Sequence, residues 1–458
     1  MADHQAQPSR GSNQGAGRHR VVIVGGGFAG LYAARELGKD PAVEVTLVDR
    51  RNYHLFQPML YQVATGALSP GDIAQPLRAI LRRNLNTRVV LGEAVGLDPA
   101  AHRVELNDGG TVEYDTLIVA TGARHAYFGR DDWAPLAPGL KTIEDATDIR
   151  RRILIAYEAA EREADPARRE EWMTFVVVGA GPTGVELAGA LGEIARDTLR
   201  RDFRSIRPAD ARVLLVEALD RVLPLYPERL SRSARGQLQH LGVTVRTSTR
   251  VTAVDEGGIE VLVGREGEGR TERIPTRTVL WAAGVQASSF GGRVAHALGV
   301  ATDRAGRLPV DVDLTVAGHH EVMILGDLAL ATRSRGKLVP GVAPAAIQEG
   351  KYAAKAIRAR VRGEVPGPFK YRDRGDVAVI GRLSGVADIR WLGRFGQMSG
   401  FVAWGMWLGV HILYLIGFAN RIVVIIRWAW SFLTHGRGTR LITGEPHLPP
   451  IKEPHRLD

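Results

Sequence analysis

Two glycine-rich segments of the kind that binds dinucleotides lie 154 residues apart in this chain. Both read G-x-G-x-x-G, the first from Gly25 to Gly30 and the second from Gly179 to Gly184. In such a turn the first glycine makes the sharp bend, the second lets the backbone approach a pyrophosphate, and the third lets the following helix pack closely on the preceding strand. The N-terminus of that helix faces the phosphates. Two dinucleotide sites in one chain indicate redox chemistry.

The segments around each fingerprint predict the strand–turn–helix unit that such a turn requires. Residues 21–24 and 175–178 are Val-rich runs that predict buried parallel strands. Residues 31–37 and 185–194 have the composition of the helices that follow. The expected dinucleotide-binding residues of these turns are Gly25, Gly27, Phe28, Ala29 and Gly30 in the first and Gly179, Gly181 and Gly184 in the second.

An acidic residue completes each fingerprint at the end of the next predicted strand. Asp49 ends residues 43–49, 19 residues after Gly30, and Glu217 ends residues 212–217, 33 residues after Gly184. A carboxylate at this place accepts hydrogen bonds from a ribose 2′-hydroxyl and repels a 2′-phosphate. The alternative is an ordinary solvated carboxylate at a strand end. The dinucleotide interpretation predicts a preference for NADH over NADPH.

Three further strand-to-turn segments follow the order of a two-dinucleotide enzyme. They cover residues 117–122, 279–284 and 322–327, and a predicted helix at 345–360 follows the last. As single patterns they are weak, because many strands end in glycine. Their terminal residues are the remaining cofactor-binding candidates, namely Thr121, Gly122, Ala283, Gly284, Gly326 and Asp327.

Composition limits the classes of partner and chemistry. The chain has 458 residues, a net charge of +10 and a pI near 10, which favours an acidic partner such as nucleic acid or anionic lipid. We expect no nucleic-acid partner, because no such motif occurs and the basic residues are scattered. The chain has no cysteine, which excludes structural disulfides, thiolate-held iron–sulfur clusters and a redox-active cysteine pair. No His/Asp/Glu cluster has metal-ligand spacing, so we expect no metal site.

The order of these motifs resembles the glutathione-reductase-like flavoproteins, which bind FAD and NAD(H). The resemblance implies an α/β fold with two Rossmann-like dinucleotide-binding domains, one inserted in the other, and a C-terminal membrane-associating helical region. It places Asp327 at the ribityl and phosphate part of the flavin and adds Arg50 to the cofactor-binding residues. The expected divisions are a disordered tail at 1–18, an FAD-binding domain at 19–140 and 277–345, an NAD(H)-binding domain at 141–276, a quinone-side region at 346–398, membrane-anchoring helices at 399–440 and a tail at 441–458.

Within that superfamily the chain resembles the type II NADH dehydrogenases. The resemblance lies in residues 53–66 (YHLFQPMLYQVATG), 181–189 (GPTGVELAG), 343–348 (APAAIQ) and 373–382 (DRGDVAVIGR). It implies a single-chain enzyme that oxidises NADH through FAD and reduces membrane quinone without pumping protons. The catalytic candidates that it implies are Glu186 beside the nicotinamide and Gln348, Arg374 and Ile380 on the quinone side.

Two departures from the family pattern leave the identity of the quinone open. Pro344 stands where the family's A-Q-x-A-x-Q motif has its first glutamine, so only Gln348 is left of the pair. Arg374 stands where many members have lysine. Simpler interpretations are that Gln348 is a solvated helix residue and that Glu186 only makes a favourable contact with the helix dipole.

The C-terminal part contains two apolar runs that could associate with a membrane. Residues 400–419 form an apolar run of 20 residues, long enough to span a bilayer, and residues 422–433 form a second run of 12. We expect a pair of helices lying on the membrane surface; the alternatives are a true span and a buried dimer interface. Aromatic and basic residues that suit the interface are Trp404, Trp407, Trp428, Trp430, Arg421, Arg427, Arg437 and Arg440. We interpret His411 as a packed or interfacial histidine, and His319 and His320 as a surface turn.

The sequence therefore predicts an FAD-dependent NADH:quinone oxidoreductase, peripheral and monotopic on the cytoplasmic face of the cell membrane. Its expected partners are NADH, a membrane quinone, the lipid surface and a second copy in a homodimer. One alternative is a soluble NADH-dependent reductase of an electron-carrier protein, of the ferredoxin-reductase type. Another is a non-respiratory flavoprotein that senses NADH.

Overall fold

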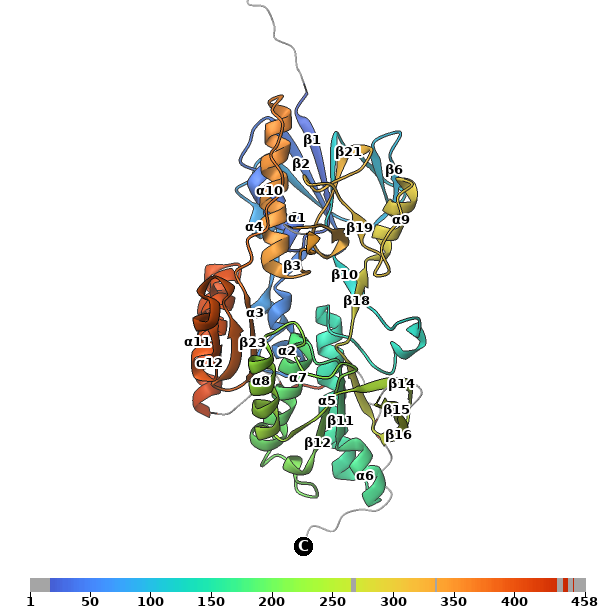
Figure 1. The fold of residues 1–458 in the computed structure, drawn as a ribbon, viewed down its shortest axis with the longest axis vertical. Helices are drawn as coiled ribbons and strands as arrows, with labels where there is room; N and C mark the ends of the chain where they lie inside the picture. The colour runs from blue at the N-terminus through green and yellow to red at the C-terminus, as the bar shows by residue number, and fades with distance from the viewer. Residues whose placement is uncertain (1–16, 265–268, 334–335, 435–439, 444–447, 449–458) are drawn as a thin grey trace, which may run out of the picture.

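A computed structural model describes residues 17–264, 269–333, 336–434, 440–443 and 448. The tail expected at 1–18 lies outside the described residues apart from Gly17 and Arg18, and so does most of the tail expected at 441–458. Two α/β domains are stacked along the long axis, and a C-terminal unit lies against their side (Figure 1). The α/β architecture with two dinucleotide-binding domains confirms the predicted fold class.

The first domain is built on a six-stranded sheet in the order β20-β21-β9-β1-β2-β5, parallel except for β20. Its strands are β1 (His19–Val24), β2 (Val43–Asp49), β5 (Thr87–Leu91), β9 (Thr116–Val119), β20 (Thr315–Val316) and β21 (His319–Ile324). His319 and His320 therefore begin a strand, and their interpretation as a surface turn is wrong. The helices are α1 (Phe28–Leu37), α4 (Leu77–Leu81), α9 (Ser289–Ala297) and α10 (Ala343–Val361).

Several small elements are formed by the segments between these strands and helices. They are β3 (Tyr53–Leu55) paired with β4 (Ala74–Pro76), the helices α2 (Leu60–Ala64) and α3 (Pro70–Ile73), the antiparallel sheet of β6 (Ala94–Asp98), β7 (Arg103–Leu106) and β8 (Thr111–Glu113), and β19 (Leu308–Pro309) paired with β22 (Ala329–Leu330).

The second domain contains a four-stranded parallel sheet in the order β13-β12-β11-β17. Its strands are β11 (Thr174–Val178), β12 (Arg212–Val216), β13 (Val243–Arg246) and β17 (Thr278–Trp281). Its helices are α5 (Ile143–Arg162), α6 (Pro166–Trp172), α7 (Pro182–Glu193) and α8 (Glu228–His240). A separate antiparallel sheet joins β14 (Thr249–Asp255), β15 (Gly258–Val263) and β16 (Arg270–Pro275).

Two expected domain boundaries need correction. β17 pairs with β11, so the second domain extends through Trp281 rather than ending at residue 276. Helix α10 packs along α1 so closely that a Cβ on Gly350 would lie 2.2 Å from the carbonyl oxygen of Ala29. Residues 346–361 therefore belong to the first domain rather than to a quinone-side region. In both cases tertiary pairing decides where the segment belongs.

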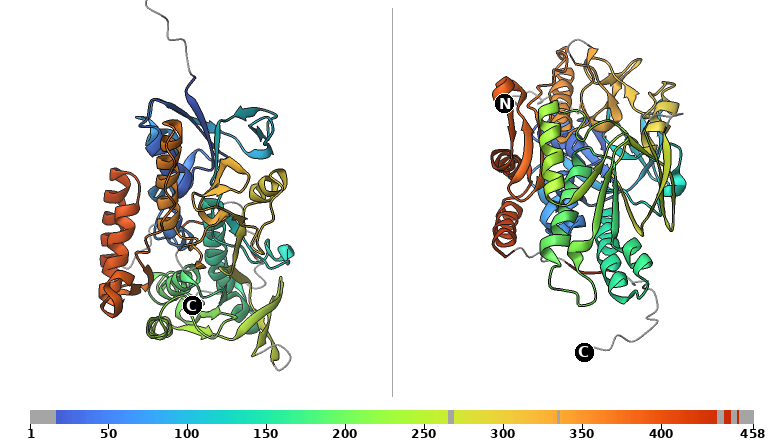
Figure 2. Two further views of the ribbon diagram at one scale, coloured as in Figure 1. Left: turned by 45° about the horizontal axis from the view of Figure 1, so that its top comes forward. Right: turned by 60° about the horizontal axis from the view of Figure 1, so that its bottom comes forward.

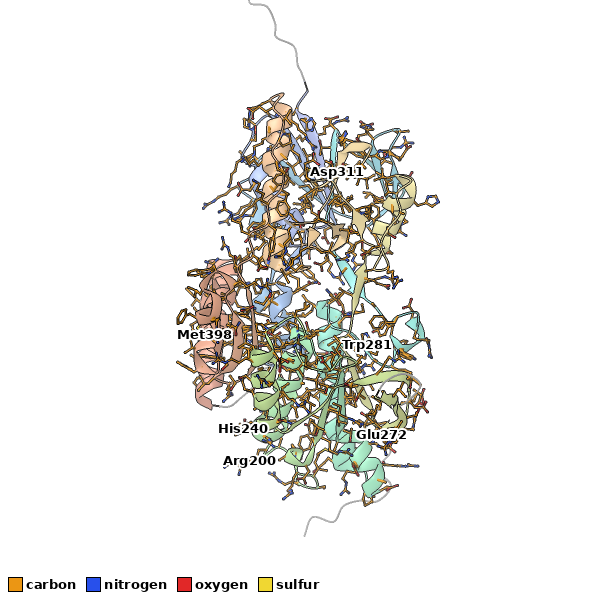
Figure 3. The ribbon with its side chains drawn as sticks, in the orientation of Figure 1. Arg200, His240, Glu272, Trp281, Asp311 and Met398 are labelled. Carbon is orange, nitrogen blue, oxygen red and sulfur yellow. The ribbon has the colours of Figure 1, made fainter. Side chains whose placement is uncertain are left out.

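An antiparallel ribbon of β10 (Ala123–His125) and β18 (Val285–Ala287) connects the two domains (Figure 1). Trp281 anchors this ribbon, because its indole Nε1 donates a hydrogen bond to the carbonyl of Ala126 at 3.0 Å. Figure 3 shows Trp281 near this junction, whereas Asp311 lies in the first domain and Glu272 in the second. The ribbon thus fixes how the two domains face each other.

The C-terminal unit consists of an antiparallel sheet of β23 (Asp376–Gly381), β24 (Ser384–Asp388) and β25 (Gln397–Ser399), followed by α11 (Phe401–Tyr414) and α12 (Phe418–Thr434). We call α11 and α12 the helical pair. Both views of Figure 2 place the pair on the outer flank of the molecule. The run 400–419 is broken after Tyr414, and Gly417 has a φ of +94°. Among the described residues, no helix is both long and apolar enough to cross a membrane.

Candidate functional site

A single cavity of about 1230 Å³ lies where the two domains and the C-terminal unit meet. Both fingerprints line it, through residues 25–29 and residues 181–183, and α11 contributes Val410, His411 and Tyr414. A cavity of about 300–1,000 Å³ is typical of one small-molecule ligand. This one is therefore large enough for more than one group to meet in it.

The first fingerprint has the backbone that a phosphate-binding turn needs. Gly25 has a φ of +106°, which a residue with a side chain rarely adopts. A Cβ on Gly30 would lie 1.9 Å from the carbonyl oxygen of Gly25, so the helix can approach the strand only because this position is glycine. Gly27 caps α1 without a side-chain hydrogen bond, and a Cβ there would meet no atom within 4 Å. The free N–H groups at the start of α1 are thus available to an anion.

The second fingerprint repeats this construction. Gly179 has a φ of +97°, and a Cβ on Gly184 would lie 1.8 Å from the carbonyl oxygen of Gly179. Gly181 caps α7 without a side-chain hydrogen bond, and no acid stands in the first turn. Ala283 lies against Gly179, where a Cβ would come within 2.7 Å of its backbone, rather than lining the cavity. Gly284 has a φ of +71° and also lies outside the cavity lining.

The two acids bind their own fingerprint turns in the same way. The Asp49 carboxylate accepts hydrogen bonds from the backbone N–H groups of Gly26, at 2.5 Å, and Arg51, at 2.7 Å. The Glu217 carboxylate accepts from Ala180 at 2.7 Å and from Leu219 at 2.9 Å. Burial raises the pKa of Asp49 above its ordinary value. Each acid therefore stands at the turn, and Asp49 and Arg50 also line the cavity.

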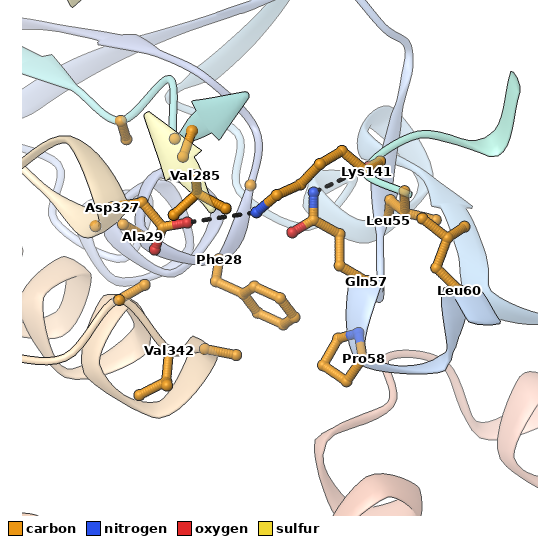
Figure 4. A pocket seen from close by; sticks show the side chains of 18 of the residues that line it. Phe28, Ala29, Leu55, Gln57, Pro58, Leu60, Lys141, Val285, Asp327 and Val342 are labelled. Carbon is orange, nitrogen blue, oxygen red and sulfur yellow. Dashed lines mark hydrogen bonds and ion pairs between the residues drawn. The ribbon is translucent and has the colours of Figure 1, made fainter. Parts of the chain in front are cut away.

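Two other strand ends reach the cavity in the first domain. Thr121, Gly122, Gly326 and Asp327 all line it, and the Thr121 hydroxyl lies 2.6 Å from that of Ser288. Asp327 forms an ion pair with Lys141, whose Nζ lies 3.9 Å from the carboxylate (Figure 4).

The buried carboxyl group of Glu349 supports the turn at Gly326, and the sequence analysis missed it. Glu349 accepts a hydrogen bond from the Gly326 N–H at 2.5 Å, and burial raises its pKa to about 8. Glu349 follows directly after the 343–348 motif, but a single glutamate in an amphipathic helix gives no signal of its own.

Glu186 is the buried acid of the second domain that faces the cavity. It lies in α7 beyond the first turn, where a helix dipole has little effect, so the dipole interpretation is not supported. Burial raises the pKa of its carboxyl to about 8, and the Val379 backbone and the Trp407 indole only partly offset that effect. The carboxyl group is therefore protonated at neutral pH.

This pKa predicts that stability falls as the pH rises. An unfolded chain ionises Glu186 above about pH 4.5, whereas the folded chain keeps the proton up to about pH 8. The stabilisation is complete below pH 4.5 and is lost as the pH rises to about 8. We expect the free energy of unfolding in urea to fall between pH 5.5 and pH 8, and the fall to be smaller in Glu186→Gln. Glu349→Gln should make the fall smaller by a similar amount, because the pKa of the Glu349 carboxyl is also raised to about 8. An unchanged fall in both variants would contradict the two assignments.

The structure separates the other three catalytic candidates from the cavity. The amide of Gln348 donates to the carbonyl of Arg372 at 3.1 Å and accepts from its N–H at 2.9 Å, so it tethers a backbone segment. The guanidinium of Arg374 is exposed and lies 3.4 Å from the hydroxyl of Tyr414. Ile380 is buried, and its carbonyl oxygen packs where Gly189 of α7 has no side chain. None of these three residues lines the cavity, and their expected place beside the reacting groups stays a prediction.

Aromatic side chains meet where the first fingerprint, the loop 53–66 and α11 come together. Phe28 projects into the cavity from the first fingerprint (Figure 4), with its ring 5.0 Å from His54 and 5.7 Å from Phe56. Phe56 in turn lies 6.0 Å from His411, which stacks on Trp407 at 4.1 Å. The loop 53–66 was recognised as a motif, but nothing in the sequence shows that it meets α11.

Within the residues that the structure describes, no group of three or more His, Cys, Asp or Glu side chains could hold a metal ion.

Comparison with known proteins adds to this geometry. The family model described as "Pyridine nucleotide-disulphide oxidoreductase" matches residues 19–350. The chain is 44% identical over 446 residues to the type II NADH:quinone oxidoreductase Ndh of Mycobacterium tuberculosis, covering 96% of this chain and 92% of that protein. It is 47% identical over 437 residues to NdhA of the same organism, covering 94% and 90%. The structure of NDH2 from Plasmodium falciparum in complex with NADH shares the fold, with a TM-score of 0.82, 19% identity and coverage of 92% and 99%.

Proposed function

Because this chain belongs to the type II NADH:quinone oxidoreductases, we propose that it carries FAD at the first fingerprint, oxidises NADH at the second and reduces a membrane quinone without pumping protons. The observation that carries this proposal is the single cavity, which joins both fingerprints to α11. The relatives favour this activity over a soluble reductase of a carrier protein and over an NADH-sensing flavoprotein.

The residues of the first domain fit FAD. The uncapped N-terminus of α1 and the open space at Gly27 and Gly122 leave room for a pyrophosphate beside unpaired N–H groups. Arg50 and Lys141 add positive charge to the same wall of the cavity. When bound, FAD supplies two-electron chemistry, by taking a hydride from NADH and giving electrons to an acceptor. We assign the first domain, with α10 included, to this group.

In the second domain the chain orients the hydride donor. The start of α7 at Gly181 would bind the pyrophosphate of NADH, and Glu217 would accept hydrogen bonds from its ribose. The protonated carboxyl of Glu186 faces the cavity between these groups and the first domain, where it can position the nicotinamide. Phe28, which projects from the first fingerprint, adds apolar surface to this part of the cavity.

The end of the cavity beside the helical pair suits the ring of a quinone. We call the part of the cavity beside α11 the apolar end; its apolar lining comes from Phe56, Pro58, Leu60, Tyr61, Val377 and Val410, and the ion-paired Asp376 and Arg390 also line the cavity. A quinone is an apolar ring with two carbonyl oxygens, so it needs mostly apolar walls with few polar groups. Because α11 forms one wall of this end, a substrate dissolved in lipid has a short way into the site.

The lipid-binding surface that we propose differs from the one expected. Trp407 is buried, Trp428 donates to the Gln62 amide at 2.7 Å, and Arg427 lies 3.2 Å from Asp72. These side chains hold the helical pair to α2 and α3. The outward-facing apolar side chains are Phe401, Val402 and Leu413 on α11, Ile422, Val423, Ile425, Ile426 and Trp430 on α12, and Trp391 and Phe395 on the adjoining turn 390–396. An exposed apolar surface of this size marks an interaction site.

Charged substitutions on this surface should release the protein from lipid. We expect the triple variant Phe395→Glu, Phe401→Glu, Ile426→Glu to lose binding to phosphatidylglycerol vesicles, since each large apolar side chain contributes about 1.5–3 kcal/mol when buried. The matched control carries Leu85→Glu, Val312→Glu and Val365→Glu, at exposed apolar residues elsewhere. The measurement is the fraction of protein that sediments with the vesicles, made on variants that keep the flavin absorbance of the wild type. Sedimentation of the triple variant at high salt would contradict the proposal. Deleting the whole segment is a poorer test, because Ala403, Trp407 and Val424 are core residues.

Steady-state turnover tests the proposed activity. The purified full chain, loaded with FAD, should oxidise NADH with a menaquinone analogue or a ubiquinone analogue, and the ratio of the two rates shows which quinone it uses. If neither quinone supports turnover but the protein reduces a ferredoxin-type carrier, the alternative of a soluble reductase of a carrier protein would be favoured. We propose the cytoplasmic face of the membrane because NADH is a cytoplasmic substrate, and a homodimer remains a prediction for sedimentation analysis.

A further inference from the structure

His411 projects from α11 to the apolar end of the cavity. The residue is only 8% exposed, and Trp407 stacks on its ring with a centroid distance of 4.1 Å and an interplanar angle of 25°. The edge of Phe56 lies on it at 6.0 Å. These two contacts fix the orientation of the imidazole, so its nitrogen atoms have defined surroundings.

The hydrogen bond of one ring nitrogen determines the state of the other. Nδ1 lies 2.7 Å from the carbonyl oxygen of Trp407, one helical turn earlier. A carbonyl oxygen can only accept, so Nδ1 carries the proton. Burial lowers the pKa of His411 to about 4, and the imidazole is therefore neutral at physiological pH. It follows that Nε2 carries a lone pair and can act only as an acceptor.

This acceptor has no donor within the described part of the chain. None of the described residues forms a hydrogen bond with Nε2. The other polar group of α11 in the lining, the Tyr414 hydroxyl, lies 3.4 Å from Arg374 on the outer side. Nε2 is not among the buried unpaired atoms of the described side chains, so it reaches the open space of the cavity, where a bound ligand can supply the donor.

On the basis of the proposed function, we propose that Nε2 of His411 accepts a hydrogen bond from a hydroxyl group of the reduced quinone, so that this site binds the hydroquinone more tightly than the quinone. The oxidised ring presents carbonyl oxygens, which accept but cannot donate. Reduction by two electrons and two protons converts both of them to hydroxyl groups, which donate. His411 transfers no proton in this role and discriminates between the two forms of the ring by its lone pair alone.

The test compares menadiol with menadione on the FAD-loaded full chain under anaerobic conditions. His411→Asn keeps an amide donor for the Trp407 carbonyl but is too short to place its oxygen where Nε2 lies, and His411→Phe keeps the ring but neither nitrogen. We expect the inhibition constant for menadiol to rise about five- to tenfold in both, the range of one neutral hydrogen bond, while the KM for menadione changes less than twofold. His411→Gln, whose amide oxygen can replace Nε2, should restore most of the menadiol affinity. His296→Asn, on the exposed face of α9, is the matched control.

A second variant separates failure of this proposal from failure of the proposed function. Val410→Trp narrows the apolar end and should raise the KM for menadione. Suppose that it does so. If the ratio of the menadiol inhibition constant to the menadione KM in both His411 variants is then the same as in the wild type, the role of His411 is refuted and the quinone site stands. If Val410→Trp leaves the KM unchanged, quinone binds elsewhere, and the role of His411 fails while the proposed activity stands. If the wild-type protein does not reduce menadione at all, the proposed function itself fails. Flavin absorbance establishes that each variant is folded and loaded before it is compared.

Discussion

Replacing Gly30 by alanine should prevent the chain from folding into a stable, FAD-loaded protein. The added Cβ would lie 1.9 Å from the carbonyl oxygen of Gly25 and 3.1 Å from the Ile23 side chain. The clash is with backbone at a turn whose φ of +106° already requires glycine, so neither partner can move aside. We expect the free energy of unfolding to fall by at least about 3 kcal/mol, the upper end of the range for overpacked cores. Thermal unfolding and the flavin absorbance of the purified protein measure it.

Two other glycine-to-alanine variants serve as controls because the same methyl group meets different surroundings. Gly236 lies on the exposed face of α8 with no atom near a Cβ, so Gly236→Ala should stabilise the chain by up to about 1 kcal/mol. Gly27→Ala also has free space, so the chain should fold, but its methyl group would project toward the pyrophosphate and weaken FAD binding. If Gly30→Ala retained full flavin and the wild-type melting temperature, the close helix–strand packing would be refuted.

These glycines explain why the architecture of both domains could be predicted from the sequence. Local requirements select the residue at each of these positions: a positive φ at Gly25 and Gly179, and close helix packing at Gly30 and Gly184. The domain boundaries could not be predicted equally well. Nothing in residues 278–281 shows that they pair with β11, and nothing in the sequence of α10 shows that it packs on α1, since both depend on contacts between distant segments.

The same difference between local and long-range contacts decides which residues of the candidate site could be predicted. Glu186 could be placed at the cavity because it lies five residues after Gly181 in the same helix, so the fingerprint fixes its position. Ile380 and Gln348 belong to motifs, but a motif does not say which way a side chain points, and both turn to backbone or core. His411 was interpreted as a packed or interfacial residue, and it is buried against Trp407. Its place at the cavity could not be predicted, because Phe56 on the opposite wall comes from a loop 355 residues away.

The preference for NADH should depend on the charge of Glu217. Its carboxylate is held at the second fingerprint by the N–H groups of Ala180 and Leu219, so it cannot turn away from a ribose 2′-phosphate. Two like charges about 4 Å apart repel by about 4 kcal/mol at an effective dielectric constant of 20, and Arg221, four residues on, softens this repulsion. We therefore expect the kcat/KM for NADH to exceed that for NADPH about a hundredfold.

Glu217→Gln keeps one amide oxygen for the Ala180 N–H but removes the charge, and we expect it to reduce this preference at least tenfold. The control is Glu256→Gln, an exposed acid of the same domain, which should leave the ratio of the two kcat/KM values unchanged. The guanidinium of Arg221 donates to the Pro224 carbonyl at 3.0 Å, which keeps it near this loop, and Glu217→Gln should therefore gain NADPH activity rather than only lose NADH activity. Equal kcat/KM for both nucleotides in the wild type, or an unchanged ratio in Glu217→Gln, would show that Glu217 does not contact the ribose.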